Sequence, residues 1–134
     1  MLRVNDVPRK ISLMNNFIKR VSSGFIMKFI LFVIDSTTRS PHSREEMMAI
    51  DALNEEMERA GHRLFACGLD SPQASQLIDF RGISTQLEQG TLMGLQEFYS
   101  GFWIVDVPNK EQAEAYAIKG SMACQRKIEL RPIL

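Results

Sequence analysis

The chain has 134 residues, of which 45% are hydrophobic and 24% charged, and these values are typical of a soluble globular protein with one domain. Residues 1–26 contain five basic side chains and one acidic side chain, whereas residues 27–134 contain 11 basic and 15 acidic ones. An acidic domain lacks the basic surface that a phosphate backbone requires, so the charge distribution argues against nucleic-acid binding through residues 27–134.

The longest apolar run, residues 25–34, is interrupted by Lys28 and is too short to span a bilayer. It also lacks the cleavage site of a secretory leader, so we predict a cytoplasmic protein without a membrane segment. Cys67 and Cys124 are far apart, and Cys67 lies in an apolar run that favours a buried thiol. The sequence has no zinc spacing, phosphate loop or dinucleotide fingerprint, and therefore predicts neither a metal nor a cofactor.

The first 26 residues leave several interpretations open. Apolar residues recur at helical spacing beside basic ones, as in an amphipathic helix that lies on a membrane, on a partner or on its own domain. The apolar residues of this pattern are Ile11, Met14, Ile18 and Val21. Alternatively, translation starts at Met27, and the segment is a miscalled start or a peripheral extension. On each interpretation the folded domain is residues 27–134.

The domain is expected to begin with a strand at residues 29–34, a continuous run of β-branched and aromatic side chains that is typical of a strand covered on both faces. A polar loop, residues 35–41, follows this strand. Ser43 and Glu46 have the spacing of a capping box and predict a helix over residues 44–60.

Gly61 is a natural stop for this helix, and residues 63–67 predict a second strand. Two further runs, residues 76–80 and 83–87, flank the dipeptide Arg81-Gly82. Two short strands around a glycine-containing pair predict a β-hairpin with a two-residue turn.

Residues 90–94 are expected to form a flexible loop, and residues 101–107 a strong strand that ends at Pro108. Asn109, with Gln112 three residues later, predicts the start of a second helix. Residues 127–130 form the last predicted strand.

The predicted elements alternate as strand, helix, strand, hairpin, strand, helix and strand. Right-handed crossovers then put both helices on one face of an antiparallel sheet, so the predicted fold is α+β and ferredoxin-like with an inserted β-hairpin. The other face of the sheet is left bare, although its first strand is apolar on both sides. The most economical cover is the same face of a second copy, and we predict a homodimer, a dimeric α+β barrel.

Five segments of the domain match a known pattern in both order and spacing. They are residues 27–31, 52–57, 60–69, 101–107 and 128–133. Together they resemble the YCII-related, DGPF-type family of dimeric α+β barrel proteins, and the resemblance covers residues 27–134. It implies the ferredoxin-like fold and the dimer.

The chain departs from this family at two points. Family members often carry an Asp-Gly-Pro-Phe stretch, of which residues 89–92 keep only the glycine. Relatives closer to YCII resemble enzymes with a histidine and aspartate dyad, but the predicted helix over residues 44–60 contains no histidine. The resemblance therefore implies no particular reaction, since one scaffold can carry many functions.

Three polar side chains are candidate site residues. Asn54 lies on or beside the sheet-facing stripe of its helix, where its amide needs a partner, either a neighbouring group or a ligand in a cavity. Glu97 lies near aromatic residues and is either a proton-transfer group or a surface ion pair. His42, in the loop before the first helix, is either solvent-exposed or catalytic.

The densest aromatic cluster lies in and before the strand at residues 101–107. Phe102 and Trp103 are expected to face opposite sides of the sheet, and Phe98 and Trp103 either pack in the core or line a small-molecule cavity. Arg63 lies at a strand end and is suited either to an acidic ligand or to an exposed ion pair.

Two functions from different classes remain. In the first, the barrel binds a small organic acid or a phenolic ligand and carries out lyase-like or isomerase-like proton transfer. Glu97 and His42 are its catalytic candidates, and its ligand-binding candidates are Asn54, Trp103, Phe98 and Arg63. In the second, the chain is a non-catalytic interaction or regulatory module. Some members of the resembled family are associated with alternative sigma factors, which makes a transcription-factor accessory one form of this second function.

Overall fold

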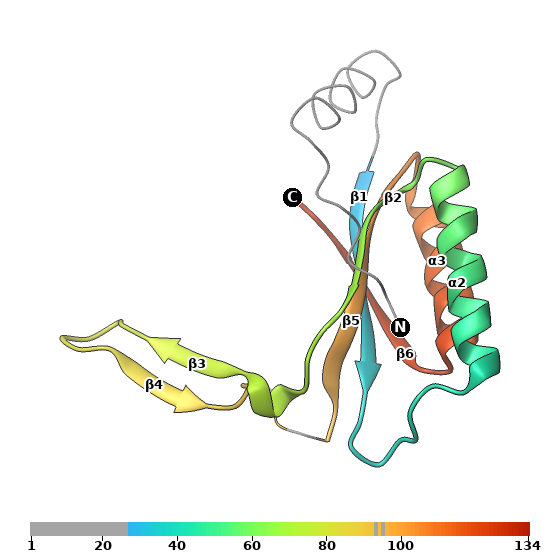
Figure 1. Ribbon diagram of the computed structural model, residues 1–134. Helices are drawn as coiled ribbons and strands as arrows, with labels where there is room; N and C mark the ends of the chain where they lie inside the picture. The colour runs from blue at the N-terminus through green and yellow to red at the C-terminus, as the bar shows by residue number, and fades with distance from the viewer. Residues whose placement is uncertain (1–26, 93, 95) are drawn as a thin grey trace.

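A computed structural model describes residues 27–92, 94 and 96–134, which contain two α-helices, one 3-10 helix and six strands (Figure 1). In chain order these are β1 (Met27–Asp35), α2 (Arg44–Arg59), β2 (Arg63–Gly68), η1 (Pro72–Ala74), β3 (Gln76–Asp79), β4 (Gln86–Gln89), β5 (Phe98–Val107), α3 (Lys110–Cys124) and β6 (Lys127–Pro132). The N-terminal segment, residues 1–26, lies outside the described residues, as does Met93 of the predicted loop.

Four strands form an antiparallel sheet in the order β2-β5-β1-β6, and both helices cover the same face of it (Figure 1). This arrangement confirms the predicted ferredoxin-like α+β fold. Because β1 and β2 are both antiparallel to β5, they run parallel to each other, and their carboxyl ends lie at the same end of the sheet.

Both ends of α2 follow from local sequence. Ser43 Oγ accepts from the backbone N–H of Glu46, and Glu46 Oε2 accepts from the backbone N–H of Ser43, each at 3.1 Å, which confirms the capping box. At the other end Gly61 has a φ of 71°, and the next N–H, that of His62, donates to the Met57 carbonyl at 2.9 Å. This is a Schellman ending, and it requires the left-handed conformation that glycine adopts without strain.

The core lies between the helices and the sheet. Leu31 of β1, Trp103 and Val105 of β5, and Met57 of α2 are all 0% exposed. On β5 the side chains alternate, so Phe102 faces the opposite side of the sheet from Trp103, as predicted.

The sheet face opposite the helices carries a row of aromatic rings, which we call the open face. Successive ring centroids of Phe65, Phe102, Phe32 and Tyr99 are 5.8, 6.3 and 4.2 Å apart. The guanidinium of Arg131 lies 5.4 Å from the centre of the Phe32 ring. The four aromatic side chains are half-buried in the described chain.

β3 and β4 form a separate two-stranded sheet that projects away from the four-stranded one (Figure 1). The predicted hairpin is confirmed, but its two-residue turn is wrong, because residues 80–85 separate the strands. The carboxylate of Asp79 accepts bonds from the backbone N–H and the Nε of Arg81 at 3.0 and 2.9 Å. These bonds close a local turn directly after Asp79 and end the ladder there.

The hairpin is unusual in its exposed apolar side chains. They are Ile78, Phe80, Ile83 and Leu87, each more than 60% exposed.

In the described part of the chain, neither α-helix is long and apolar enough to cross a membrane.

Candidate functional site

A cavity of about 790 Å³ lies at the end of the sheet where β1 and β2 finish. Its walls come from the end of β1, the loop and first turns of α2, the segment after β2, the middle of β5 and the last residue of α3. The lining residues are Val33, Asp35, Pro41, His42, Met47, Ile50, Gly68, Leu69, Asp70, Ser71, Ser100, Gly101, Trp103 and Cys124. The volume is in the range of cavities that bind small organic molecules.

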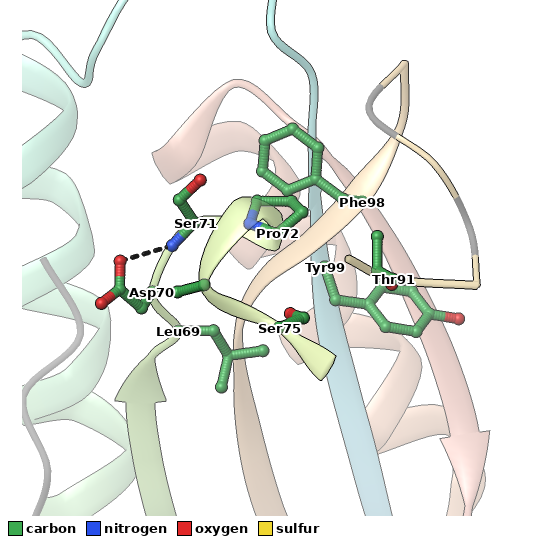
Figure 2. A pocket seen from close by; sticks show the side chains of 9 residues that line it. Leu69, Asp70, Ser71, Pro72, Ser75, Thr91, Phe98 and Tyr99 are labelled. Carbon is green, nitrogen blue, oxygen red and sulfur yellow. Dashed lines mark hydrogen bonds between the residues drawn. The ribbon is translucent and has the colours of Figure 1, made fainter. Parts of the chain in front are cut away.

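A smaller cavity of about 290 Å³ shares Leu69, Asp70 and Ser71 with the larger one. Figure 2 shows the ring of Phe98 beside Pro72 at this smaller cavity. Asp70 Oδ1 accepts a 2.6 Å hydrogen bond from the backbone N–H of Ser71, which fixes the turn after β2 (Figure 2). Residues 69–71 therefore line both cavities.

The indole of Trp103 is the largest apolar side chain in the lining of the larger cavity, and two contacts fix it. Its Nε1–H donates a 2.8 Å hydrogen bond to Asn54 Oδ1, which joins β5 to α2. On α3, a Cβ at Gly120 would lie 3.3 Å from Cζ3 of the indole, so the glycine permits close packing there. Asn54 Oδ1 also accepts from Nη1 of Arg63 at 3.1 Å.

A buried guanidinium holds the loop that carries His42. Arg126 has a side chain only 3% exposed, and its Nε lies 3.2 Å from Asp35 Oδ1 while its Nη1 lies 3.1 Å from Glu46 Oε1. Arg126 also donates to the backbone carbonyls of Cys124 and Ser40, at 3.0 and 2.8 Å. One cation therefore connects the end of β1, the loop and the start of α2.

Among the described residues that line the larger cavity, His42 is the histidine. Its side chain is 24% exposed, and its Nδ1 lies 3.6 Å from Glu46 Oε1 without a hydrogen-bond partner in the described structure. The backbone N–H of Ser43, aided by the side chains of His42 and Ser43 and by the Arg126 charge, holds the pKa of Glu46 below its usual value. Glu46 is therefore an anion beside the imidazole at neutral pH.

The two cysteines are buried thiols, as the sequence predicted for Cys67. Burial raises the pKa of both thiols. Cys124, which lines the larger cavity, is therefore protonated at neutral pH and contributes an apolar surface rather than a nucleophile.

The structure brings two of the predicted site residues, His42 and Trp103, to the larger cavity, and Phe98 to the smaller one. Asn54 is buried and bonds to Trp103 and Arg63, so its amide oxygen faces side chains rather than either of these cavities.

The other two predicted residues, Arg63 and Glu97, also lie outside the lining of these two cavities. Nη2 of Arg63 is 3.2 Å from Glu58 Oε2, so both ends of its guanidinium have protein partners. The Glu97 side chain is exposed and forms an ion pair with Lys127.

Sequence reasoning missed three polar residues of the site, namely Asp35, Asp70 and Arg126. Asp35 is the last residue of β1, and Asp70 follows β2 by two residues. Because β1 and β2 are parallel, carboxylates that follow them lie at the same end of the sheet, on either side of β5. This signal was present in the predicted topology. Arg126 had no such signal. It lies in the two-residue connection between α3 and β6, together with Gln125.

Within the described residues, no three His, Cys, Asp or Glu side chains gather in an arrangement that could hold a metal ion. No protein-family model matches the chain, and no curated protein is significantly similar to it in sequence.

Proposed function

We propose that this chain binds a small organic molecule in the cavity of about 790 Å³. The observation that carries the proposal is the composition of the walls. The lining contains the apolar side chains of Met47 and Leu69, which are 40% and 46% exposed, together with the polar groups of His42 and Asp35. A cavity with a large apolar surface and a few convergent polar groups is the usual form of a small-molecule site.

We also propose that the chain is a homodimer through its open face and a member of the YCII-related, DGPF-type family. The row of aromatic rings over β2, β5 and β1 supports the dimer, because an apolar sheet face without a helix layer is stabilised by a second layer. The order of the elements supports the family, as every segment that carries the resemblance falls in a strand or helix of the expected type or at its end.

If the bound molecule undergoes chemistry, His42 is the residue we assign to proton transfer. It lines the cavity, and the carboxylate of Glu46 lies 3.6 Å from its Nδ1. Glu97, the other catalytic candidate, is held in an exposed ion pair and gains no support from its position. The matched test is exchange of carbon-bound hydrogens of the ligand with solvent deuterium. We expect His42→Gln to abolish this exchange and Glu97→Gln to leave it unchanged; the reverse pattern would contradict the assignment.

The experiment for binding is a fragment screen observed by protein NMR. Trp103 is the sole tryptophan of the chain, so its indole N–H gives a single resonance that reports on the cavity wall. We expect the fragments that bind to shift this resonance and to raise the melting temperature. A screen in which no fragment binds, or in which bound fragments leave the indole resonance unmoved, would overturn the proposal.

The projecting hairpin favours a second candidate function, an interaction or regulatory module. The apolar side chains of β3, β4 and their connection are largely exposed, and a two-stranded hairpin is only marginally stable in water by itself. Such a surface is typical of a protein contact. Replacing Ile78 and Leu87 by serine distinguishes the two functions. Ligand binding that survives the double change supports the small-molecule function. Self-association and partner binding that both stay unchanged would remove the interaction function.

A further inference from the structure

The charges around the larger cavity decide which class of ligand it takes. Asp35 and Asp70 both line the cavity, whereas no lysine or arginine does so among the described residues. The same lining contains the exposed apolar side chains of Met47 and Leu69. The inference thus rests on the proposed small-molecule cavity and concerns what its polar end recognises.

The buried guanidinium behind the cavity leaves this end negative. Arg126 pairs with two carboxylates, those of Asp35 and Glu46, so the three side chains together keep one net negative charge. Asp70 adds a second, and its carboxylate bonds to the backbone N–H of Ser71, which carries no charge. An anionic ligand would therefore meet net repulsion at the polar end.

The bonds of the carboxylates also leave acceptor capacity. In the described structure, the hydrogen bond from the backbone N–H of Ser36 and the ion pair with Arg126 both fall on Oδ1 of Asp35. The bond to Asp70 likewise ends on Oδ1. A carboxylate has two oxygens and about four lone-pair positions, so both groups retain an oxygen that can accept from a ligand.

We propose that the cavity selects a small aromatic or arylalkyl amine, with its ammonium group at Asp35 or Asp70 and its ring against the apolar part of the lining. An ammonium donates up to three hydrogen bonds and accepts none, which matches carboxylates that each keep an oxygen able to accept. The exposed apolar side chains of the lining, Met47 and Leu69, suit the rest of the molecule. An organic acid would need a cation that the described lining does not supply, since Arg63 bonds to Asn54 and Glu58 instead.

The test compares three probes of nearly the same shape: phenethylamine, 2-phenylethanol and phenylacetate. Binding is measured by the fluorescence of Trp103 at about pH 8, where the amine is still protonated. We expect phenethylamine to bind about tenfold more tightly than the alcohol, with phenylacetate the weakest, and the difference to shrink as salt is added.

Met47 and Met48 give a matched pair of variants. Met47 lines the cavity and is 40% exposed, whereas Met48 is 62% exposed and does not line it, so a charge is tolerated at each position. Met47→Lys should weaken phenethylamine binding about tenfold and improve that of phenylacetate, while Met48→Lys should change neither. Asp70→Asn should weaken the amine severalfold and leave the alcohol unaffected.

The outcomes separate this inference from the proposed function. Equal or tighter binding of phenylacetate than of phenethylamine, with a change in Trp103 fluorescence, overturns the amine preference but keeps the small-molecule cavity. Amine binding that Met47→Lys and Asp70→Asn do not weaken also overturns the preference. Absence of binding by all three probes overturns the amine preference as well. The proposed small-molecule function of the cavity is removed only if the fragment screen also fails.

Discussion

The indole nitrogen of Trp103 donates to the side-chain oxygen of Asn54 across 2.8 Å, and this one bond joins the central strand β5 to helix α2. Both residues are buried, and the same oxygen also accepts from Arg63. Because the indole forms a wall of the larger cavity, the amide of Asn54 sets the shape of a site that it does not itself line.

Replacing Asn54 by alanine should therefore destabilise the protein and alter the cavity together. The change leaves the N–H of a fully buried indole without an acceptor, and we expect a loss of about 1–3 kcal/mol in the free energy of unfolding. Urea denaturation followed by Trp103 fluorescence measures this loss. Glu55→Ala, at the neighbouring exposed position of the same helix, is the control and should stay within about 0.5 kcal/mol of wild type. Equal stability of the two variants would show that the bond contributes little.

Arg126→Met tests the buried cation that connects β1, the loop and α2. Methionine keeps much of the apolar volume of the stem but leaves Asp35 and Glu46 without their cation, so we expect a loss of about 3–5 kcal/mol. Lys127→Met removes the adjacent, exposed cation that pairs with Glu97, and it should cost no more than about 1 kcal/mol. Thermal or urea unfolding gives both values. A similar small effect in both variants would contradict the structural role of Arg126.

Acid should weaken the start of α2 through Glu46. The capping bond from the Ser43 N–H lowers the pKa of this carboxyl in the folded state. A lowered folded-state pKa means that the stabilisation is fully present above the unfolded-state value and is lost as the pH falls through the folded-state value. Glu46→Gln keeps a side-chain acceptor but does not titrate, so we expect its stability to fall less than that of wild type on acidification below about pH 5. Parallel pH curves for the two proteins would refute this.

The open face predicts the effect of a charge on association. Phe102 contacts Phe32 and Phe65 in the middle of the aromatic row, so Phe102→Glu should convert a dimer into a monomer at micromolar concentration. Ile118→Glu, on an exposed position of α3 on the other side of the sheet, should leave the dimer intact. Sedimentation velocity measures both, with circular dichroism as the check on folding. A monomeric wild type would contradict the dimer directly.

Much of the fold was predictable because its signals are local. Ser43 with Glu46 and Gly61 each act within one turn of helix, so the bounds of α2 could be predicted to within a residue. The turn of the hairpin could not, because the carboxylate of Asp79 competes with the ladder for Arg81, and the spacing of apolar residues carries no trace of that competition.

The site was less predictable because it depends on contacts between distant elements. The pattern indicated that Asn54 needs a partner, but a helical periodicity cannot say that the partner is Trp103, 49 residues away. Asp35 and Asp70 could have been placed at the same end of the sheet from the parallel direction of their strands. Arg126 could not have been found in this way, because its partners belong to three separate parts of the chain.

The most direct test of a ligand-binding cavity is the crystal structure of the protein with the tightest fragment from the NMR screen. We predict that the fragment lies against Trp103, with a polar atom within hydrogen-bond distance of His42, Asp35 or Asp70. A fragment bound elsewhere, with the space between these residues filled by the protein's own side chains, would contradict the account.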